Sequence, residues 1–238
     1  MPHLWNELWD ERGESYPNDD PIKLDGFDQS FGTITPEALS TLVDGISGNL
    51  ELRDDDRLLD LGCGAGMLLS RLTPRVQIAY GTDRSSGMIQ RGHKISSGMT
   101  LMQAESTHLP FEAATFDKVL AHSVFQYFDS HDYAFNVLAE LLRVSKPGSR
   151  MLIGDIMDAA SKKEYLEERR LSVDANRRLW KSSIEPPEHL YYCKHFFVEF
   201  ASRYGLDCVI TPCGLEGYQN GLYRYQVLLV RSERESRP

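Results

Sequence analysis

Three closely spaced glycines and two acids are the part of this 238-residue sequence whose types and spacing suit ligand binding. Gly62, Gly64 and Gly66 follow a short apolar run. Asp60 lies within that run, and Asp83 follows the next apolar segment. Glycine lacks the Cβ atom that would prevent a sharp turn or the close approach of a ligand. A strand that ends in such a loop and leads into a helix is typical of nucleotide binding, with the second acid accepting the hydroxyl groups of a ribose.

The spacing of the glycines distinguishes this loop from the dinucleotide-binding fingerprint. In G-x-G-x-x-G the third glycine is five positions after the first, whereas Gly66 is four positions after Gly62. The following helix therefore begins earlier, which suits a ligand without a pyrophosphate. The spacing argues against a nicotinamide-dependent oxidoreductase, the other class of enzyme that uses such a loop.

Five motifs in the same order resemble those of the class I S-adenosylmethionine-dependent methyltransferases. They are the glycine loop, the segment of the second acid, an adenine-contacting loop, the start of a fourth strand and a helix–turn–strand signature, at 62–66, 81–83, 104–111, 116–119 and 142–150. The resemblance implies an α/β, Rossmann-like fold: a doubly wound, mostly parallel seven-stranded sheet with an antiparallel last strand. It also implies S-adenosyl-L-methionine as cofactor and S-adenosyl-L-homocysteine as product.

The resemblance further implies which residues bind the cofactor. The backbone of 62–66, including Cys63, would pack against the methionine and ribose, while Asp60 would orient the loop and help receive the ammonium group. Asp83 would accept the ribose hydroxyl groups; its alternative role is the N-cap of the following helix. The other implied contacts come from Glu105 (where the family usually has Asp), the Ser106 N–H group, Arg84, Met88 and His122.

Candidate catalytic residues follow the fourth strand, the position nearest the transferred methyl group in the family that the chain resembles. His122 is a candidate general base because an unperturbed imidazole titrates near neutrality; its alternative role is a spacer under the cofactor. Tyr127 shapes the pocket or packs in the core. Asp155, at the end of the fifth strand, is a further candidate for a base or for binding a substrate hydroxyl group. The alternative candidates, each expected at the surface or in a cap, are His131, His189 and His195.

Alternating strands and helices must position these residues. We expect strands near 57–61, 76–82, 99–103, 117–122 and 150–156, and helices near 66–73, 85–95 and 130–144. This alternation predicts a parallel, doubly wound sheet with right-handed crossovers. Ligands bind at the carboxyl ends of such strands, where the acids and His122 converge. A last pair of strands, 207–212 and 223–231, is predicted to form an antiparallel hairpin.

The predicted methyltransferase domain spans 36–238 and carries two additional segments. Residues 1–35 are aromatic and acidic and predict an N-terminal arm, which either closes the pocket or packs against a second subunit in a homodimer. Residues 157–193 predict a helical insertion, packed on the domain edge or closing over the substrate as a lid. Thr35, followed by proline, predicts the N-cap of a helix over 36–46.

Composition excludes several classes of partner. The net charge of −9 and the pI near 5.3 argue against binding of DNA or of an anionic membrane. Only the basic segment 161–181 favours an RNA acceptor. The four cysteines have no metal-binding spacing, so we expect reduced thiols, no metal and a cytoplasmic protein. We see no signal peptide and no apolar run of transmembrane length.

Methyl transfer from a sulfonium is an in-line displacement that requires orientation of donor and acceptor but no metal. The segment 217–225 is rich in side chains that bind polyols. With 123–128 and 154–156 it resembles, more weakly, methyltransferases of bacterial surface-polysaccharide pathways. We therefore predict a small-molecule methyltransferase whose acceptor is a hydroxyl group of a sugar-like or other polar metabolite. An RNA methyltransferase and a non-catalytic partner subunit are the alternatives.

Overall fold

A computed structural model describes residues 4–27, 33–171 and 182–233 of the chain. Its helices and strands are, in chain order, α1 Leu4–Ser15, α2 Pro21–Leu24, α3 Pro36–Leu50, β1 Arg57–Leu61, α4 Leu69–Leu72, β2 Ile78–Asp83, α5 Ser86–Ile95, β3 Thr100–Gln103, β4 Phe116–His122, α6 His131–Val144, β5 Ser145–Met157, α7 Lys162–Leu171, α8 Lys194–Tyr204, β6 Leu206–Pro212 and β7 Arg224–Arg231. A short 3₁₀ helix, η2 Phe125–Tyr127, follows β4. Among these described residues no helix is both long and apolar enough to cross a membrane.

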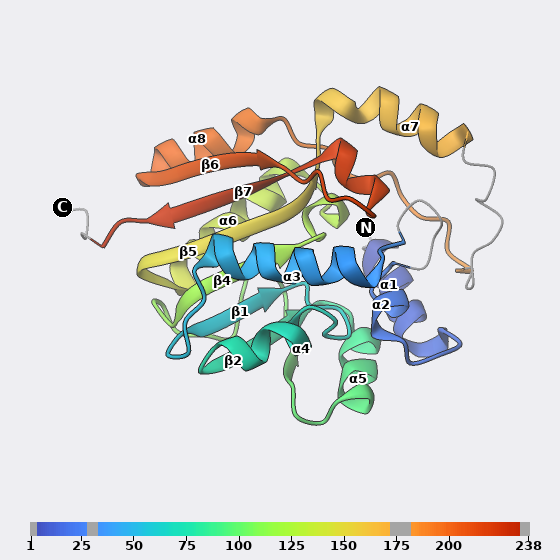
Figure 1. Cartoon of the computed structure of the whole chain (residues 1–238), viewed down its shortest axis with the longest axis horizontal. Coiled ribbons are helices and arrows are strands. Elements are labelled where there is room, and N and C mark those ends of the chain that lie inside the picture. The colour runs from blue at the N-terminus through green and yellow to red at the C-terminus, as the bar shows by residue number, and fades with distance from the viewer. Residues whose placement is uncertain (1–3, 28–32, 172–181, 234–238) are drawn as a thin grey trace.

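Seven strands form one sheet in the order β3-β2-β1-β4-β5-β7-β6 (Figure 1). Neighbouring strands from β3 to β5 run parallel, and β7 lies between β5 and β6 and runs antiparallel to both. The predicted doubly wound Rossmann-like sheet and its terminal antiparallel hairpin are thus confirmed. The register pairs Asp60 with Gly81 and His122 with Gly154, so the carboxyl ends of the central strands are aligned.

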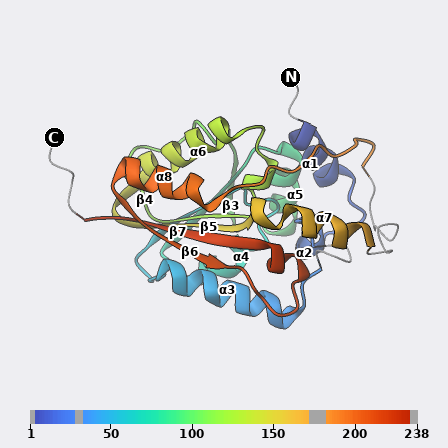
Figure 2. The same cartoon turned by 90° about the horizontal axis from the view of Figure 1, so that it is seen from above.

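Helices cover both faces of the sheet (Figure 2). On one face α6 and α8 contribute Leu138 and Phe197 to a buried apolar cluster. On the other face α3 and α4 contribute Leu39 and Leu69 to a second cluster. A largely parallel sheet requires such cover on both sides because its strands are apolar on both faces.

Local sequence signals account for most element boundaries. The Thr35 hydroxyl group accepts a hydrogen bond from the Ala38 N–H group at 3.1 Å, as expected of an N-cap, but α3 continues beyond the predicted end to Leu50. α4 is shorter than predicted because the glycine loop occupies its expected first turn. β5 begins earlier than predicted, at Ser145. In the predicted insertion α7 is present, while 172–181 lie outside the described residues.

The N-terminal arm lies at the carboxyl ends of the central strands (Figure 1). α1 packs against α5, where Asp10 accepts hydrogen bonds from the Ser85 hydroxyl group and the Gly87 N–H group, each at 2.9 Å. Arg91 of α5 donates in return to the carbonyl oxygen of Gly13 at 3.0 Å. These contacts fix the arm over the end of the sheet where the site lies.

Candidate active site

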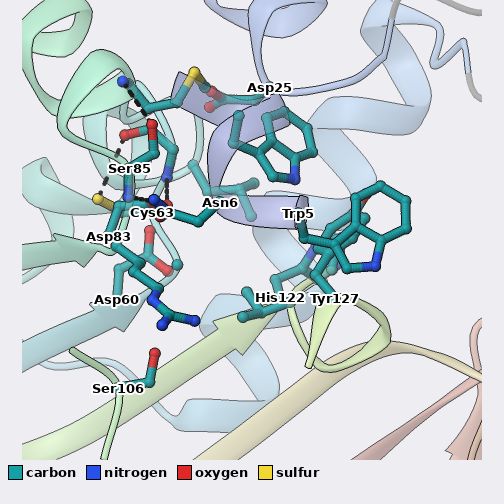
Figure 3. A pocket seen from close by; sticks show the side chains of 18 of the residues that line it. Trp5, Asn6, Asp25, Asp60, Cys63, Asp83, Ser85, Ser106, His122 and Tyr127 are labelled. Carbon is teal, nitrogen blue, oxygen red and sulfur yellow. Dashed lines mark hydrogen bonds between the residues drawn. The ribbon is translucent and has the colours of Figure 1, made fainter. Parts of the chain in front are cut away.

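A pocket lies at the carboxyl ends of β1, β2 and β4, against the arm (Figure 3). Its walls come from the glycine loop, the ends of these strands, η2 and α1. It brings together most of the predicted site residues, namely Asp60, Gly62, Cys63, Gly64, Asp83, Arg84, Met88, Ser106, His122 and Tyr127. The lining residues that the sequence did not indicate include Trp5, Asn6, Trp9, Asp25 and Phe27.

Two glycines of the loop have different roles. Gly64 has a φ of +55°, and a Cβ atom there would lie 2.5 Å from a carboxylate oxygen of Asp25. Gly66 has a φ of +91°, and a Cβ atom there would lie 2.7 Å from the sulfur of Met99. Gly66 is not among the described lining residues. Gly64 therefore permits a contact at the pocket wall, whereas Gly66 permits close packing of the loop on the domain.

Asp83 binds the backbone of the glycine loop. Its carboxylate accepts hydrogen bonds from the N–H groups of Gly64 at 2.9 Å and Ser85 at 2.8 Å. The N-cap of α5 is Ser85, whose hydroxyl group accepts a hydrogen bond from the Met88 N–H group at 3.1 Å. The capping role considered for Asp83 therefore belongs to Ser85, and Asp83 instead joins the loop to the end of β2 while lining the pocket.

Asp25 is the main residue of the site that the sequence analysis missed. It follows α2, and its carboxylate accepts hydrogen bonds from the N–H groups of Ala65 at 2.7 Å and Met67 at 3.0 Å. The arm contains many acids, and no local pattern distinguishes Asp25 from the others. Together Asp25 and Asp83 occupy the loop N–H groups of Gly64, Ala65 and Met67.

Three carboxyl groups line this end of the pocket, that of the buried Asp60 and those of the half-buried Asp25 and Asp83. Burial raises the pKa of Asp25 to about 7 and also raises the pKa values of Asp60 and Asp83, with repulsion from neighbouring carboxylates adding to the effect. Because carboxylates already occupy the loop donors, a phosphate would meet negative charge here, whereas a cation would be stabilised. The arrangement opposes a pyrophosphate and suits a ligand with an ammonium or sulfonium group.

Glu105, predicted to contact adenine, is held at the edge of the pocket. Its carboxylate pairs with Arg84 at 3.2 Å and accepts a hydrogen bond from the Tyr133 hydroxyl group. Arg84, Tyr133 and Ser106 line the pocket, whereas Glu105 is not among the described lining residues. The adenine contact of Glu105 stays a prediction.

His122 and Tyr127 lie across the pocket from Asp60 and Asp83 and beside Trp5 (Figure 3). The ring of Trp5 packs edge-on against that of Tyr127, with centroids 4.8 Å apart. The ring of His122 packs against β5 so closely that a Cβ atom on Gly154 would lie 2.6 Å from it. Burial lowers the pKa of His122, so its imidazole is neutral at neutral pH and able to accept a proton.

Asp155 forms a buried ion pair and is not among the described residues that line the pocket. Its carboxylate binds the Arg224 guanidinium and accepts a hydrogen bond from the Tyr218 hydroxyl group at 3.1 Å. Tyr218 and Arg224 belong to the segment 217–225, which was predicted to bind polyols. The negative charge of Asp155 opposes the effect of burial on the pKa of His122, whereas the positive charge of Arg224 adds to it. Asp155 can therefore influence the candidate base without touching a ligand.

The remaining candidate histidines are dispersed. His131 of α6 contacts the carbonyl oxygen of Tyr191 through Nε2 at 3.0 Å. His189 stacks on Trp5 with ring centroids 4.8 Å apart, on the arm side of the pocket. His195 is exposed on α8. None of the three is among the described residues that line the pocket with His122.

The strand order, the glycine loop after β1 and the carboxyl groups of the pocket define a class of protein. It is a Rossmann-like fold that binds a nucleoside cofactor, and the pocket favours a cofactor whose other end is positively charged. Such a site differs from that of a dinucleotide enzyme at the point where the pyrophosphate would bind.

Comparison with known proteins agrees with this class. Residues 59–153 match the family model described as methyltransferase domain. The chain is 29% identical to part of the chondramide synthase of Chondromyces crocatus, over 95% of this chain and 6% of the synthase. It is 28% identical to the 27-O-demethylrifamycin SV methyltransferase of Amycolatopsis mediterranei, over 65% of this chain and 54% of that protein. The chain therefore spans little more than half of the rifamycin methyltransferase and a small part of the synthase.

A solved structure has the same fold. It is the phosphoethanolamine N-methyltransferase 1 of Haemonchus contortus in complex with phosphoethanolamine and S-adenosylhomocysteine. The match has a TM-score of 0.71 at 13% identity, over 98% of this chain and 49% of that one. These matches support a class I S-adenosylmethionine-dependent methyltransferase that uses S-adenosylmethionine as its cofactor. The carboxyl-lined end of the pocket fits the positive charges of that cofactor.

Proposed function

We propose that this chain transfers the methyl group of S-adenosylmethionine to a hydroxyl group of a small polar molecule, with His122 as general base. The cofactor, when bound, supplies a methyl group on a positively charged sulfur. His122 carries the proposal because it lines the pocket opposite the carboxyl groups and is neutral at neutral pH. A neutral imidazole accepts the proton that a hydroxyl group loses as its oxygen is methylated.

The arm supports a small acceptor. Trp5 and Trp9 of α1 pack against Tyr127, with ring centroids 4.8 and 5.4 Å apart, and enclose the side of the pocket next to the candidate base. The net charge of −9 makes a nucleic-acid acceptor unfavourable. The name of the Amycolatopsis relative, 27-O-demethylrifamycin SV methyltransferase, is consistent with a hydroxyl acceptor.

Tyr127 and Asp155 complete the proposed catalytic set in different ways. Burial raises the pKa of Tyr127, so its hydroxyl group stays protonated and is available to donate a hydrogen bond to the acceptor oxygen. Asp155 acts through His122, since its charge keeps the pKa of the imidazole from falling further. The sequence-based role of Asp155 as a base in its own right is the weaker one because Arg224 and Tyr218 bind its carboxylate.

Methylation assays with hydroxylated acceptors, including sugar nucleotides, test the proposal through the formation of S-adenosylhomocysteine. His122→Asn should lower kcat by about 10²- to 10⁴-fold, the usual contribution of a positioned general base. His93→Asn is the matched control because His93 is exposed on α5, and it should leave kcat unchanged. Full activity of His122→Asn would remove the assigned base. Turnover of amine or RNA acceptors but of no hydroxyl acceptor would overturn the assigned acceptor class.

A further inference from the structure

The contact between Asp25 and the glycine loop joins two parts of the chain that are 40 residues apart. One carboxylate oxygen of Asp25 accepts from the Ala65 N–H group and the other from the Met67 N–H group. An ionised carboxylate has about four acceptor positions, and these two hydrogen bonds use two of them. Asp25 also lines the pocket, so its remaining acceptor capacity is available to a ligand there.

The surroundings of Asp25 favour a cation at this place. Asp60 is 3% exposed, lines the same pocket and receives no hydrogen bond from any described side chain or backbone group. Arg84 is the cationic side chain among the described lining residues, and its guanidinium pairs with Glu105 at 3.2 Å. A buried carboxyl group without a donor is costly unless a ligand provides one. An ammonium group has three N–H donors, a number sufficient for both Asp60 and Asp25.

We propose that the carboxylate of Asp25, a residue of the N-terminal arm, receives the α-ammonium group of the cofactor's methionine part, together with Asp60. This inference rests on the cofactor assignment above. It makes the arm a structural part of the cofactor site. The same arm carries Trp5 and Trp9, so cofactor binding also holds the aromatic wall of the acceptor side in place.

Calorimetric titration with three ligands separates recognition of the ammonium group from support of the loop. S-adenosylhomocysteine has both the ammonium and carboxylate groups, S-adenosyl-3-thiopropylamine has only the ammonium group, and 5′-methylthioadenosine has neither. Asp25→Asn should weaken binding of the first two ligands roughly 10- to 100-fold, the range for a charged hydrogen bond, and leave the third little changed. Glu14→Gln is the matched control in the arm, because Glu14 is exposed on α1.

Each outcome decides the proposal. Equal weakening of all three ligands would mean that Asp25 only supports the loop, and unchanged affinities would mean that it meets no ligand; both overturn the inference. If wild-type protein binds none of the three, the cofactor assignment itself fails. If Asp25→Asn does not fold, the wild-type protein still provides a test. S-adenosyl-3-thiopropylamine must then bind more tightly than 5′-methylthioadenosine, and equal binding would overturn the inference.

Discussion

Gly13 and Gly87 touch through their backbones where α1 crosses α5. A Cβ atom on Gly13 would lie 2.2 Å from the carbonyl carbon of Gly87. A Cβ atom on Gly87 would lie 2.4 Å from the carbonyl oxygen of Asp10. Since the opposing atoms belong to the backbone, neither helix can yield by a side-chain rotation. This contact sets how closely the arm approaches the domain and therefore where Trp5 and Asp25 lie.

Gly13→Ala should displace α1 from α5 and lower the free energy of unfolding by about 1–3 kcal/mol, the usual cost of overpacking. Affinity for S-adenosylhomocysteine should fall as well, because arm residues line the cofactor pocket. Urea unfolding and calorimetry measure the two effects. Gly45→Ala is the matched control within α3, where a Cβ atom would meet nothing within 4 Å. It should be neutral or stabilise by up to about 1 kcal/mol. Equal effects of the two variants would contradict the contact.

Asp83→Ala should weaken S-adenosylhomocysteine binding by about 1.5–3 kcal/mol, the usual cost of leaving the partners of a charged hydrogen bond unpaired. The ribose would lose its acceptor, and the N–H groups of Gly64 and Ser85 would lose theirs. Titration calorimetry measures the change. Asp44→Ala provides a control, because that side chain is 64% exposed and pairs with Arg75 at the surface. An unchanged dissociation constant for Asp83→Ala would contradict the expected contact with the ribose.

Cofactor affinity should rise as the pH increases from about 5.5 to about 7.5. In the protein without ligand the pKa of Asp25 is about 7. A cationic ligand favours the ionised carboxyl group. Below that pKa, binding of the ligand therefore releases a proton from Asp25. The affinity should then increase by up to about tenfold per pH unit and level off above pH 7. The charged groups that act on Asp25 are Asp83, Arg12 and Asp60. Titrations of S-adenosylhomocysteine across this range test the sign, with 5′-methylthioadenosine as the uncharged control. A flat profile for both ligands would argue against an ionising group in the site.

Arg224→Met should destabilise the protein by about 3–5 kcal/mol, because it leaves the Asp155 carboxylate buried without its cation. Asp155→Asn should cost less, because the amide oxygen can still accept a hydrogen bond from Arg224 and asparagine tolerates the left-handed φ of 60° at this position. The double variant should be more stable than the sum of the two single effects predicts. Chemical denaturation of all four proteins gives this coupling energy. Additive effects would indicate that the two side chains do not depend on each other.

The sequence alone was sufficient to predict the sheet, the glycine loop at the end of β1 and the class of protein. The glycines at 62, 64 and 66 and the N-cap at Thr35 act on backbone a few residues away, so a short segment of sequence is enough to predict their effect. The alternation of apolar and amphipathic segments then determined the order of layers. For the same reason the carboxyl ends of the strands could be named as the place of the site before any contact was known.

Tertiary structure alone decided which acid of the arm reaches the loop and which candidate base faces the pocket. Asp25 meets Ala65 across 40 residues, and Arg224 meets Asp155 across 69 residues. Each pairing depends on how separate elements pack. The sequence around Asp25 resembles that of an exposed acid, and the sequence around Arg224 resembles that of any strand residue. The position of Asp155 at the end of its strand made it a candidate base. In the folded protein its carboxylate pairs with Arg224, and His122 lines the pocket instead. Burial and pairing are properties of the packed molecule, and these properties determine which titratable groups can act on a ligand.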